Sequence, residues 1–191
     1  SRCGRCTAWY PNLKDHTVAR KRPHGPVAIL ELFCAASHFR KLCDRTGNML
    51  LVRVDNDDDF EPDFCVDIVK WAESGKFKAD LKRMFGNPPW VDLLAATPEC
   101  TQVSLANYRM RYKDPTVFRA MLRATAIVAS YLRTINPRLL SFRETPQTGR
   151  GKDQPEWIKE EKRLGATHID YEACAGGALW EKATRVDCSH Q

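Results

Sequence analysis

One stretch decides how the chain is organised: residues 93–104, which read LLAATPECTQVS. The apolar run from Val91 to Ala96 is typical of a short buried strand, and Pro98 ends it. Cys100 follows two residues later. Because ligands of open α/β sheets bind just beyond the carboxyl ends of the strands, the stretch predicts a thiol at the mouth of a site. The alternative is a buried cysteine that only fills space in the core.

The composition indicates one globular domain rather than a membrane or secreted protein. The chain has 191 residues, of which 43% are hydrophobic and 28% charged, and this balance is ordinary for a domain with a full core. No apolar run approaches the ~18 residues of a membrane span, and no secretory leader is recognisable. We therefore expect an intracellular protein, in cytoplasm or nucleus, whose eight cysteines are mostly reduced. The net charge of +6 suits a polyanionic partner, although it also serves solubility.

The chain divides into a basic N-terminal arm or linker, residues 1–26, and a folded domain, residues 27–191. The arm is polar and is interrupted by three prolines. It contains a Cys-x-x-Cys pair at Cys3 and Cys6, followed by two distant histidines. These four residues lack the regular spacing of a zinc site, so no metal is predicted.

Strands and helices are expected to alternate along the domain. The pattern predicts strands over residues 27–34, 49–54, 65–69, 91–96, 138–142, 167–171 and 183–188, and helices over 40–43 (ending near Gly47), 73–84 and 114–136. The polar residues 149–162 are expected to form a loop or a mobile cover. This order predicts an α/β fold with a mostly parallel sheet and helices on both faces.

Two carboxylates stand where a nucleotide-like ligand would need them. Asp55 ends the second expected strand 20 residues after Ala35, the spacing at which Rossmann-type folds bind ribose hydroxyls; an acidic loop is the alternative. Asp67 interrupts the third expected strand. Because an unpaired buried carboxylate is costly, we expect a ligand amino group or a backbone N–H beside it.

The order of these motifs resembles the cytosine-C5 DNA methyltransferase family, especially its short phage and protist forms. The resemblance rests on Glu-Leu-Phe-Cys at 31–34, Pro-x-Cys-Thr at 98–101 and Pro-Gln-Thr-Gly at 146–149, and it extends from Val27 to Cys188. It implies a Rossmann-like class I methyltransferase fold, S-adenosyl-L-methionine as cofactor and DNA as the substrate. No membrane partner is implied.

The resemblance also implies roles for individual residues. Cys100 would attack C6 of cytosine, Glu144 would hydrogen-bond N3, and Arg185 would help to hold the base. Glu31 would lie near the methionine end of the cofactor, while Asp55 would take the ribose hydroxyls and Asp67 the adenine amino group. The complete cofactor-binding set is Glu31, Phe33, Ala35, Ser37, Asp55, Asp67, Ile68 and Pro98.

Several positions depart from the family pattern. Ala35 and Ser37 replace two glycines, Thr145 replaces an asparagine, and Glu99 replaces the proline before the cysteine. We expect the Glu99 carboxylate to raise the pKa of the adjacent thiol by like-charge repulsion. The chain also ends where the family continues into a target-recognition region, so a missing segment or a separate chain is expected to supply it.

Three alternatives remain at this point. The chain could be a degenerate member that binds cofactor or nucleic acid without turnover. It could be an interaction module with a Rossmann-like core that uses its basic charge on nucleic acid. It could also be an enzyme of the same chemistry that acts on RNA cytosine.

Overall fold

Seven strands form one sheet in the order β3-β2-β1-β4-β5-β7-β6. The computed structural model describes residues 26–35, 37–99, 115–146, 151–164, 167–172 and 183–188. The strands are β1 (Val27–Leu32), β2 (Met49–Asp55), β3 (Phe64–Cys65), β4 (Leu93–Ala96), β5 (Leu140–Pro146), β6 (Thr167–Glu172) and β7 (Ala183–Cys188). Strands β1 to β5 are parallel, and β7 lies antiparallel between β5 and β6. The predicted mostly parallel α/β sheet is therefore confirmed.

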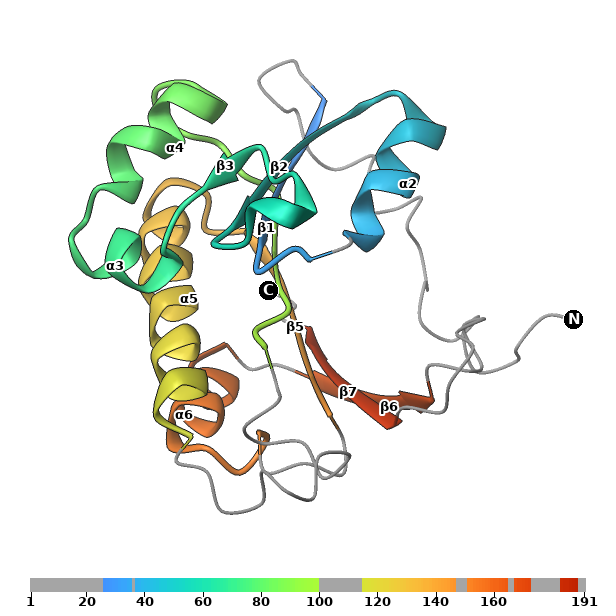
Figure 1. Ribbon diagram of the computed structural model, residues 1–191, viewed down its shortest axis with the longest axis vertical. Helices are drawn as coiled ribbons and strands as arrows, with labels where there is room; N and C mark the ends of the chain where they lie inside the picture. The colour runs from blue at the N-terminus through green and yellow to red at the C-terminus, as the bar shows by residue number, and fades with distance from the viewer. Residues whose placement is uncertain are drawn as a thin grey trace, which may run out of the picture.

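Helices cover both faces of this sheet, as predicted (Figure 1). They are α2 (His38–Thr46), α3 (Ile68–Glu73), α4 (Phe77–Phe85), α5 (Thr116–Ile135) and α6 (Pro155–Leu164), with a short 3-10 helix, η2 (Asp58–Phe60). Helix α2 lies on one face, whereas α3, α4 and α5 lie on the other. Among the described segments, no helix combines the length and apolar character that crossing a bilayer requires.

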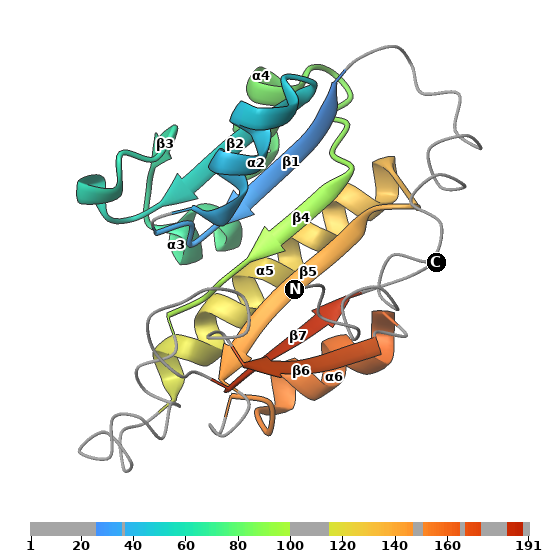
Figure 2. The same ribbon diagram turned by 90° about the vertical axis from the view of Figure 1, so that its right-hand side faces the viewer.

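The main core lies between the sheet and the helices α3, α4 and α5. Alternate strand residues point to one face, and the apolar stripe of α5 repeats every three to four residues, so the two surfaces can pack together. Its almost completely buried members include Leu30, Leu32, Val54, Leu94, Phe77, Leu81, Phe118, Leu122 and Leu132. We call this packed region the helix layer. Figure 2 shows α5 running along β4 and β5.

The third expected strand was wrong in its extent. Strand β3 ends at Cys65, and Asp67 is the N-cap of α3, where its Oδ1 accepts a hydrogen bond from the N–H of Lys70 at 3.1 Å. A carboxylate at this position satisfies a backbone donor that the helix leaves unpaired, so it does not need a buried partner. The helix expected over 73–84 is α4, which begins later, at Phe77, because Gly75 at φ 74° separates it from α3.

The loop expected over residues 149–162 is also wrong, because most of it forms α6. The ring of Trp157 is fully buried and lies 4.4 Å from the guanidinium of Arg143 on β5. The carboxylate of Glu156 accepts hydrogen bonds from Arg119 at 2.8 Å and Arg123 at 3.1 Å, both on α5. One buried aromatic side chain and one ion-paired carboxylate thus hold a mostly polar helix in place.

Candidate functional site

The sheet has its topological switch point between β1 and β4. From β1 the chain proceeds to β2 and β3 on one side, and β4 then begins on the other side of β1. Connections leaving the carboxyl ends of β1 and β4 therefore diverge and leave room for a ligand. Thr97, just after β4, joins the two ends: its Oγ1 donates to the carbonyl of Phe33 at 2.7 Å, and its N–H donates to the carbonyl of Leu32 at 3.2 Å.

The turn from β1 to α2, residues 33–37, lies at this edge and contains no glycine. Its backbone nevertheless has positive φ at Phe33 (57°), Ala35 (39°) and Ser37 (39°). Residues with a Cβ adopt such angles at a cost of about 1–3 kcal/mol each, so the surrounding structure must hold them. Ala35 is exposed, whereas Phe33 and Ser37 are buried. The two departures from the family glycines therefore fall where glycine would relieve strain.

A buried carboxylate supports the end of this turn. Glu31, in β1, is only 1% exposed, and its Oε2 accepts a hydrogen bond from the Ser37 hydroxyl at 2.5 Å. The same hydroxyl accepts from the N–H of Arg40, so Ser37 is also the N-cap of α2. Burial raises the pKa of Glu31, and the hydrogen bond from Ser37 opposes that shift only in part. Glu31 thus positions the end of the turn through its hydrogen bond with Ser37.

Asp55, at the end of β2, is buried as well, with 5% of its surface exposed. Its Oδ2 accepts from the N–H of Ala35 at 3.0 Å, and its Oδ1 accepts from the N–H groups of Asn56 at 2.8 Å and Asp57 at 3.1 Å. The carboxylate therefore links the β1–α2 turn to the loop after β2. Its predicted contact with ribose hydroxyls stays a prediction.

Three further members of the predicted cofactor set lie near these strand ends. The N–H of Val66 donates to the carbonyl of Asp55 at 2.7 Å, which brings the start of α3 to the same edge. Asp67 is exposed, and the hydrogen bond from the Lys70 N–H is the main cause that lowers its pKa. The side chain of Ile68 is buried in the helix layer, so only its backbone is available at the edge. Pro98 is buried just beyond β4.

The predicted catalytic acid, Glu144, lies near the carboxyl end of β5. Ala96 of β4 pairs with Arg143, so Glu144 stands one residue beyond the end of β4. Arg143 packs against α6, and side chains alternate along a strand, so Glu144 faces the side that carries α2. Phe142 on that side meets Phe39 of α2 edge to face, with centroids 5.9 Å apart. Glu144 and Glu31 therefore share one face of the sheet.

The other two predicted catalytic residues are placed only in part. Arg185, in β7, pairs with Thr145 in the antiparallel register, so its backbone lies beside the neighbour of Glu144. Cys100 lies outside the described residues, as do Cys3 and Cys6; the described chain leaving β4 ends at exposed Glu99. The structure therefore brings Glu144 and the Arg185 strand together and shows where the Cys100 segment starts.

Two residues near the turn were not singled out by sequence reasoning. Thr97 joins β4 to the turn, and a hydroxyl residue between a buried strand and a proline is the signal that points to it. Cys34 lies within the turn, but burial, with Asp55 and Glu31 adding to it, raises the pKa of its thiol to about 12. Cys34 therefore remains a neutral thiol at physiological pH and is not a candidate nucleophile.

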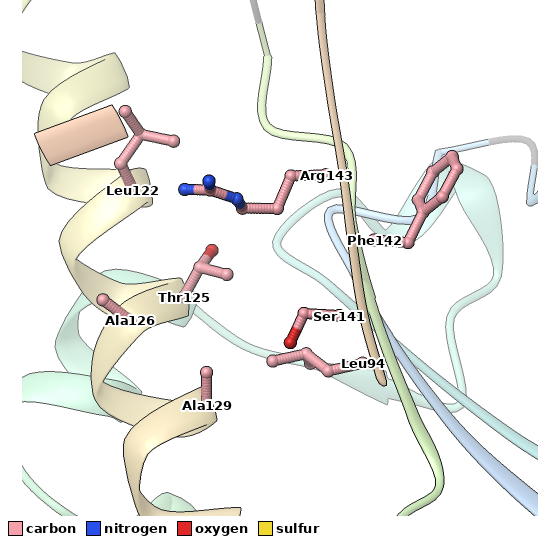
Figure 3. A pocket seen from close by; sticks show the side chains of 8 residues that line it. All are labelled: Leu94, Leu122, Thr125, Ala126, Ala129, Ser141, Phe142 and Arg143. Atoms are coloured by element: carbon pink, nitrogen blue, oxygen red, sulfur yellow. The ribbon is translucent and has the colours of Figure 1, made fainter. Parts of the chain in front are cut away.

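A small cavity lies on the opposite face, between α5 and the strands β4 and β5 (Figure 3). Its volume is about 10 Å³, close to the space of one water molecule. The guanidinium of Arg143 points toward α5 in Figure 3, while Phe142 points away. This cavity is a packing feature of the helix layer and is separate from the strand ends. Within the described residues, no three His, Cys, Asp or Glu side chains gather as metal ligands.

Comparison with known proteins supports the fold. No family model matches the sequence, and none of the curated proteins matches it. A solved antibiotic-related methyltransferase is similar over 87% of this chain and 89% of its own, with 12% identity and a TM-score of 0.51. Human methyltransferase 10 domain containing protein covers 90% of this chain and 74% of its own, at 7% identity and a TM-score of 0.44.

A third similar structure is the N-terminal domain of human METTL16 in complex with SAH, at 9% identity and a TM-score of 0.43, covering 95% of this chain and 68% of its own. The TM-score of the first structure and the strand order with β7 reversed agree on one architecture. The chain has a class I methyltransferase fold. The predicted Rossmann-like methyltransferase fold is thus confirmed, whereas the finer likeness to cytosine-C5 enzymes stays a prediction.

Proposed function

We propose that this protein transfers a methyl group from S-adenosyl-L-methionine to C5 of cytosine in nucleic acid, with DNA as the first candidate. One observation carries the proposal. Glu144 lies near the end of β5, one residue past the end of β4. Strand β4 also pairs with β1, Thr97 hydrogen-bonds its end to the β1–α2 turn, and the Cys100 segment follows β4 in the sequence. A nucleophile, an acid and a cofactor turn at one sheet edge are what this chemistry requires.

The edge offers groups that suit the cofactor. Ala35 is exposed at the turn, where its small side chain allows close approach to the backbone. Asp67 is an exposed carboxylate that can accept hydrogen bonds from an amino group. Buried Glu31 and Asp55 accept hydrogen bonds from Ser37 and Ala35 and so support the turn that faces the cofactor. When bound here, the cofactor would supply an electrophilic methyl group on a positively charged sulfur.

The chain's own residues would carry the remaining chemistry. The thiolate of Cys100 bonds to C6 of the extruded base, and the ring electrons move toward C5 and N3. The Glu144 carboxyl group hydrogen-bonds to N3 and stabilises that charge, while Arg185 holds the base. The electron pair at C5 would bond to the methyl group as the cofactor's S–CH3 bond breaks, which would leave S-adenosylhomocysteine as the neutral thioether. A base then removes the C5 proton, and the C6–Sγ bond breaks to restore both the aromatic ring and the thiolate.

Transfer of a labelled methyl group tests the proposal. We expect incorporation into C5 of cytosine in DNA by the wild-type protein, and loss of about 1,000-fold or more in Cys100→Ser, because a hydroxyl is a far poorer nucleophile at neutral pH. Glu144→Gln is expected to lose most of the activity while it still binds cofactor. Cys65→Ser is the matched control, because Cys65 is an exposed thiol on β3 that the proposal does not use.

The same assay separates the rival functions. Incorporation into RNA alone would favour the RNA enzyme. Cofactor binding without transfer to either polymer would favour a non-catalytic member of the fold, a possibility to which the glycine-free turn gives specific support. Equal loss of activity in Cys100→Ser and Cys65→Ser would contradict the assignment of Cys100 as the nucleophile.

A further inference from the structure

The β1–α2 turn must be held from outside, because its own residues do not favour its shape. Phe33, Ala35 and Ser37 all have positive φ, and none is a glycine. At φ 39°, the Cβ of Ala35 crowds the neighbouring carbonyl, a contact that glycine would not make. Unlike the turn's other two strained residues, Ala35 is exposed, so packing does little to hold it.

One described side chain from outside the turn restrains the backbone of Ala35. The Oδ2 of Asp55 accepts its N–H at 3.0 Å across a separation of 20 residues. Thr97 and Glu31 act elsewhere on the turn, at the carbonyl of Phe33 and the hydroxyl of Ser37. The central strained residue of the turn is thus tied to the end of β2 by a carboxylate.

Asp55 has little capacity left for a ligand. Its two oxygens already accept three backbone N–H groups, from Ala35, Asn56 and Asp57, and only 5% of its surface is exposed. Because a carboxylate has about four acceptor positions, a ribose that used both hydroxyls would have to displace at least one of these bonds and reach a buried group. The backbone N–H that was displaced would lose its partner, so the exchange would bring little net gain.

We propose that Asp55 is a positioning residue: it fixes Ala35 and the β1–α2 turn in the shape that receives the cofactor, and acts on cofactor binding through that turn rather than by contact with the ribose. This inference rests on the proposed function. It adds to the proposed function a distinction between the residue that shapes the cofactor site and the residues that contact the cofactor.

Two thermodynamic cycles test the inference. In both, calorimetry measures the affinity of the protein for S-adenosylhomocysteine. The first combines Asp55→Asn with Ala35→Gly. Asparagine keeps the size of the side chain but replaces one acceptor by a donor, so a backbone N–H loses its partner. We expect Asp55→Asn to lower affinity about tenfold in the alanine background and less than about threefold in the glycine background, because glycine adopts the turn without a tether. Equal losses in both backgrounds would overturn the inference.

The second cycle combines the substitution Asp55→Asn with a change of ligand. It compares the affinity for S-adenosylhomocysteine with the affinity for its 2′,3′-dideoxy analogue, which lacks both ribose hydroxyls. If Asp55 acts through the turn, the substitution weakens both ligands by the same factor. If the carboxylate binds the hydroxyls directly, the factor falls to about one for the dideoxy analogue, because the lost contact no longer exists. That result would overturn the inference.

Asp57→Asn is the matched control. Asp57 stands two residues away in the same acidic loop, is exposed, and caps η2 by accepting the N–H of Asp59 at 3.0 Å. We expect its affinity to stay within about twofold of wild type, because surface charges are screened by solvent. A loss as large as that in Asp55→Asn would show that loop charge, and not the tether, affects binding.

Unfolding without ligand separates this inference from the proposed function. Asp55→Asn is expected to lower the free energy of unfolding more in the alanine than in the glycine background. If the wild type binds neither ligand but Asp55→Asn still destabilises the alanine background more, the proposed function is wrong and only the restraint of Ala35 by Asp55 is supported. If the wild type binds both ligands but Asp55→Asn destabilises both backgrounds equally, the restraint is wrong and the cofactor site is still supported.

Discussion

Two regions of the molecule differ in side-chain polarity and in backbone geometry: the helix layer, and the edge formed by the β1–α2 turn with Asp55 and Thr97. The helix layer is apolar, its larger side chains are almost completely buried, and its helices have ordinary backbone angles. The edge buries carboxylates and hydroxyls and includes three residues at positive φ. The helix layer thus stabilises the fold, while the edge retains strained and polar features that are typical of ligand sites.

The largest expected effect concerns the helix layer. Phe118 on α5 has no exposed surface, so Phe118→Ala should lower the free energy of unfolding by about 3–5 kcal/mol through lost burial and a residual cavity. Phe60→Ala is the control on η2, where Phe60 is 40% exposed, and should cost less than about 1 kcal/mol. Urea denaturation measures both. Similar losses of unfolding free energy in the two variants would contradict the claim that packing in the helix layer stabilises the fold.

The next effect tests the polar tie at the edge. Thr97→Val keeps the shape of the side chain but removes the donor to the Phe33 carbonyl at 2.7 Å, and should cost about 1–3 kcal/mol. Thr134→Val removes a hydrogen bond of the same length to the carbonyl of Tyr131, but on an exposed part of α5. We expect the control to change stability by less than about 0.5 kcal/mol, because water replaces the lost donor.

A smaller effect of opposite sign should follow from relieving strain. Ala35→Gly should raise the melting temperature of the ligand-free protein, with a gain of about 1 kcal/mol from the positive φ, less the backbone entropy of glycine. Ala79→Gly makes the same change at an exposed position inside α4 and should lower stability by about 1 kcal/mol. If both substitutions destabilise equally, the turn is not strained.

The smallest effect is a difference in pH dependence between two glutamates. Burial raises the pKa of Glu31, so the folded state binds its proton more tightly, and stability should fall as pH rises from about 4.5 through the folded pKa. Hydrogen bonds from Arg119 lower the pKa of Glu156, so its contribution is present above about 4.5 and is lost as pH falls through the folded pKa. Urea denaturation between pH 3 and 7 should show Glu31→Gln and Glu156→Gln removing slopes of opposite sign.

Most of the fold could be predicted because its signals are local. Helix α5 begins after Pro115 and ends before Pro137, and Gly47 ends α2 in the left-handed conformation with its N–H on the carbonyl of Cys43. The reversal of β7 was not predictable, because strand direction depends on distant pairing. Helix α6 was missed because its surface is polar, although Pro155 at its start and basic residues in its last turn were signals.

The candidate site was predictable in residue type but not in role. Order along the chain indicated Glu31, Asp55 and Glu144 as edge carboxylates, and the structure places all three at or near the carboxyl ends of strands. What the sequence could not show is which oxygens are already occupied: Asp55 by three backbone donors, and Glu31 by Ser37. Asp67 was expected to be buried because its N-cap geometry has no signature separate from that of a short strand.

The central claim is that Cys100 is the nucleophile at this edge, and peptide mapping of a trapped complex tests it most directly. The wild-type protein is incubated with S-adenosyl-L-methionine and DNA that carries 5-fluorocytosine, whose fluorine blocks release of the base, and the adduct is digested and weighed by mass spectrometry. We predict a single modified peptide that contains Cys100. No adduct, or an adduct on the exposed thiol of Cys65, would contradict the account.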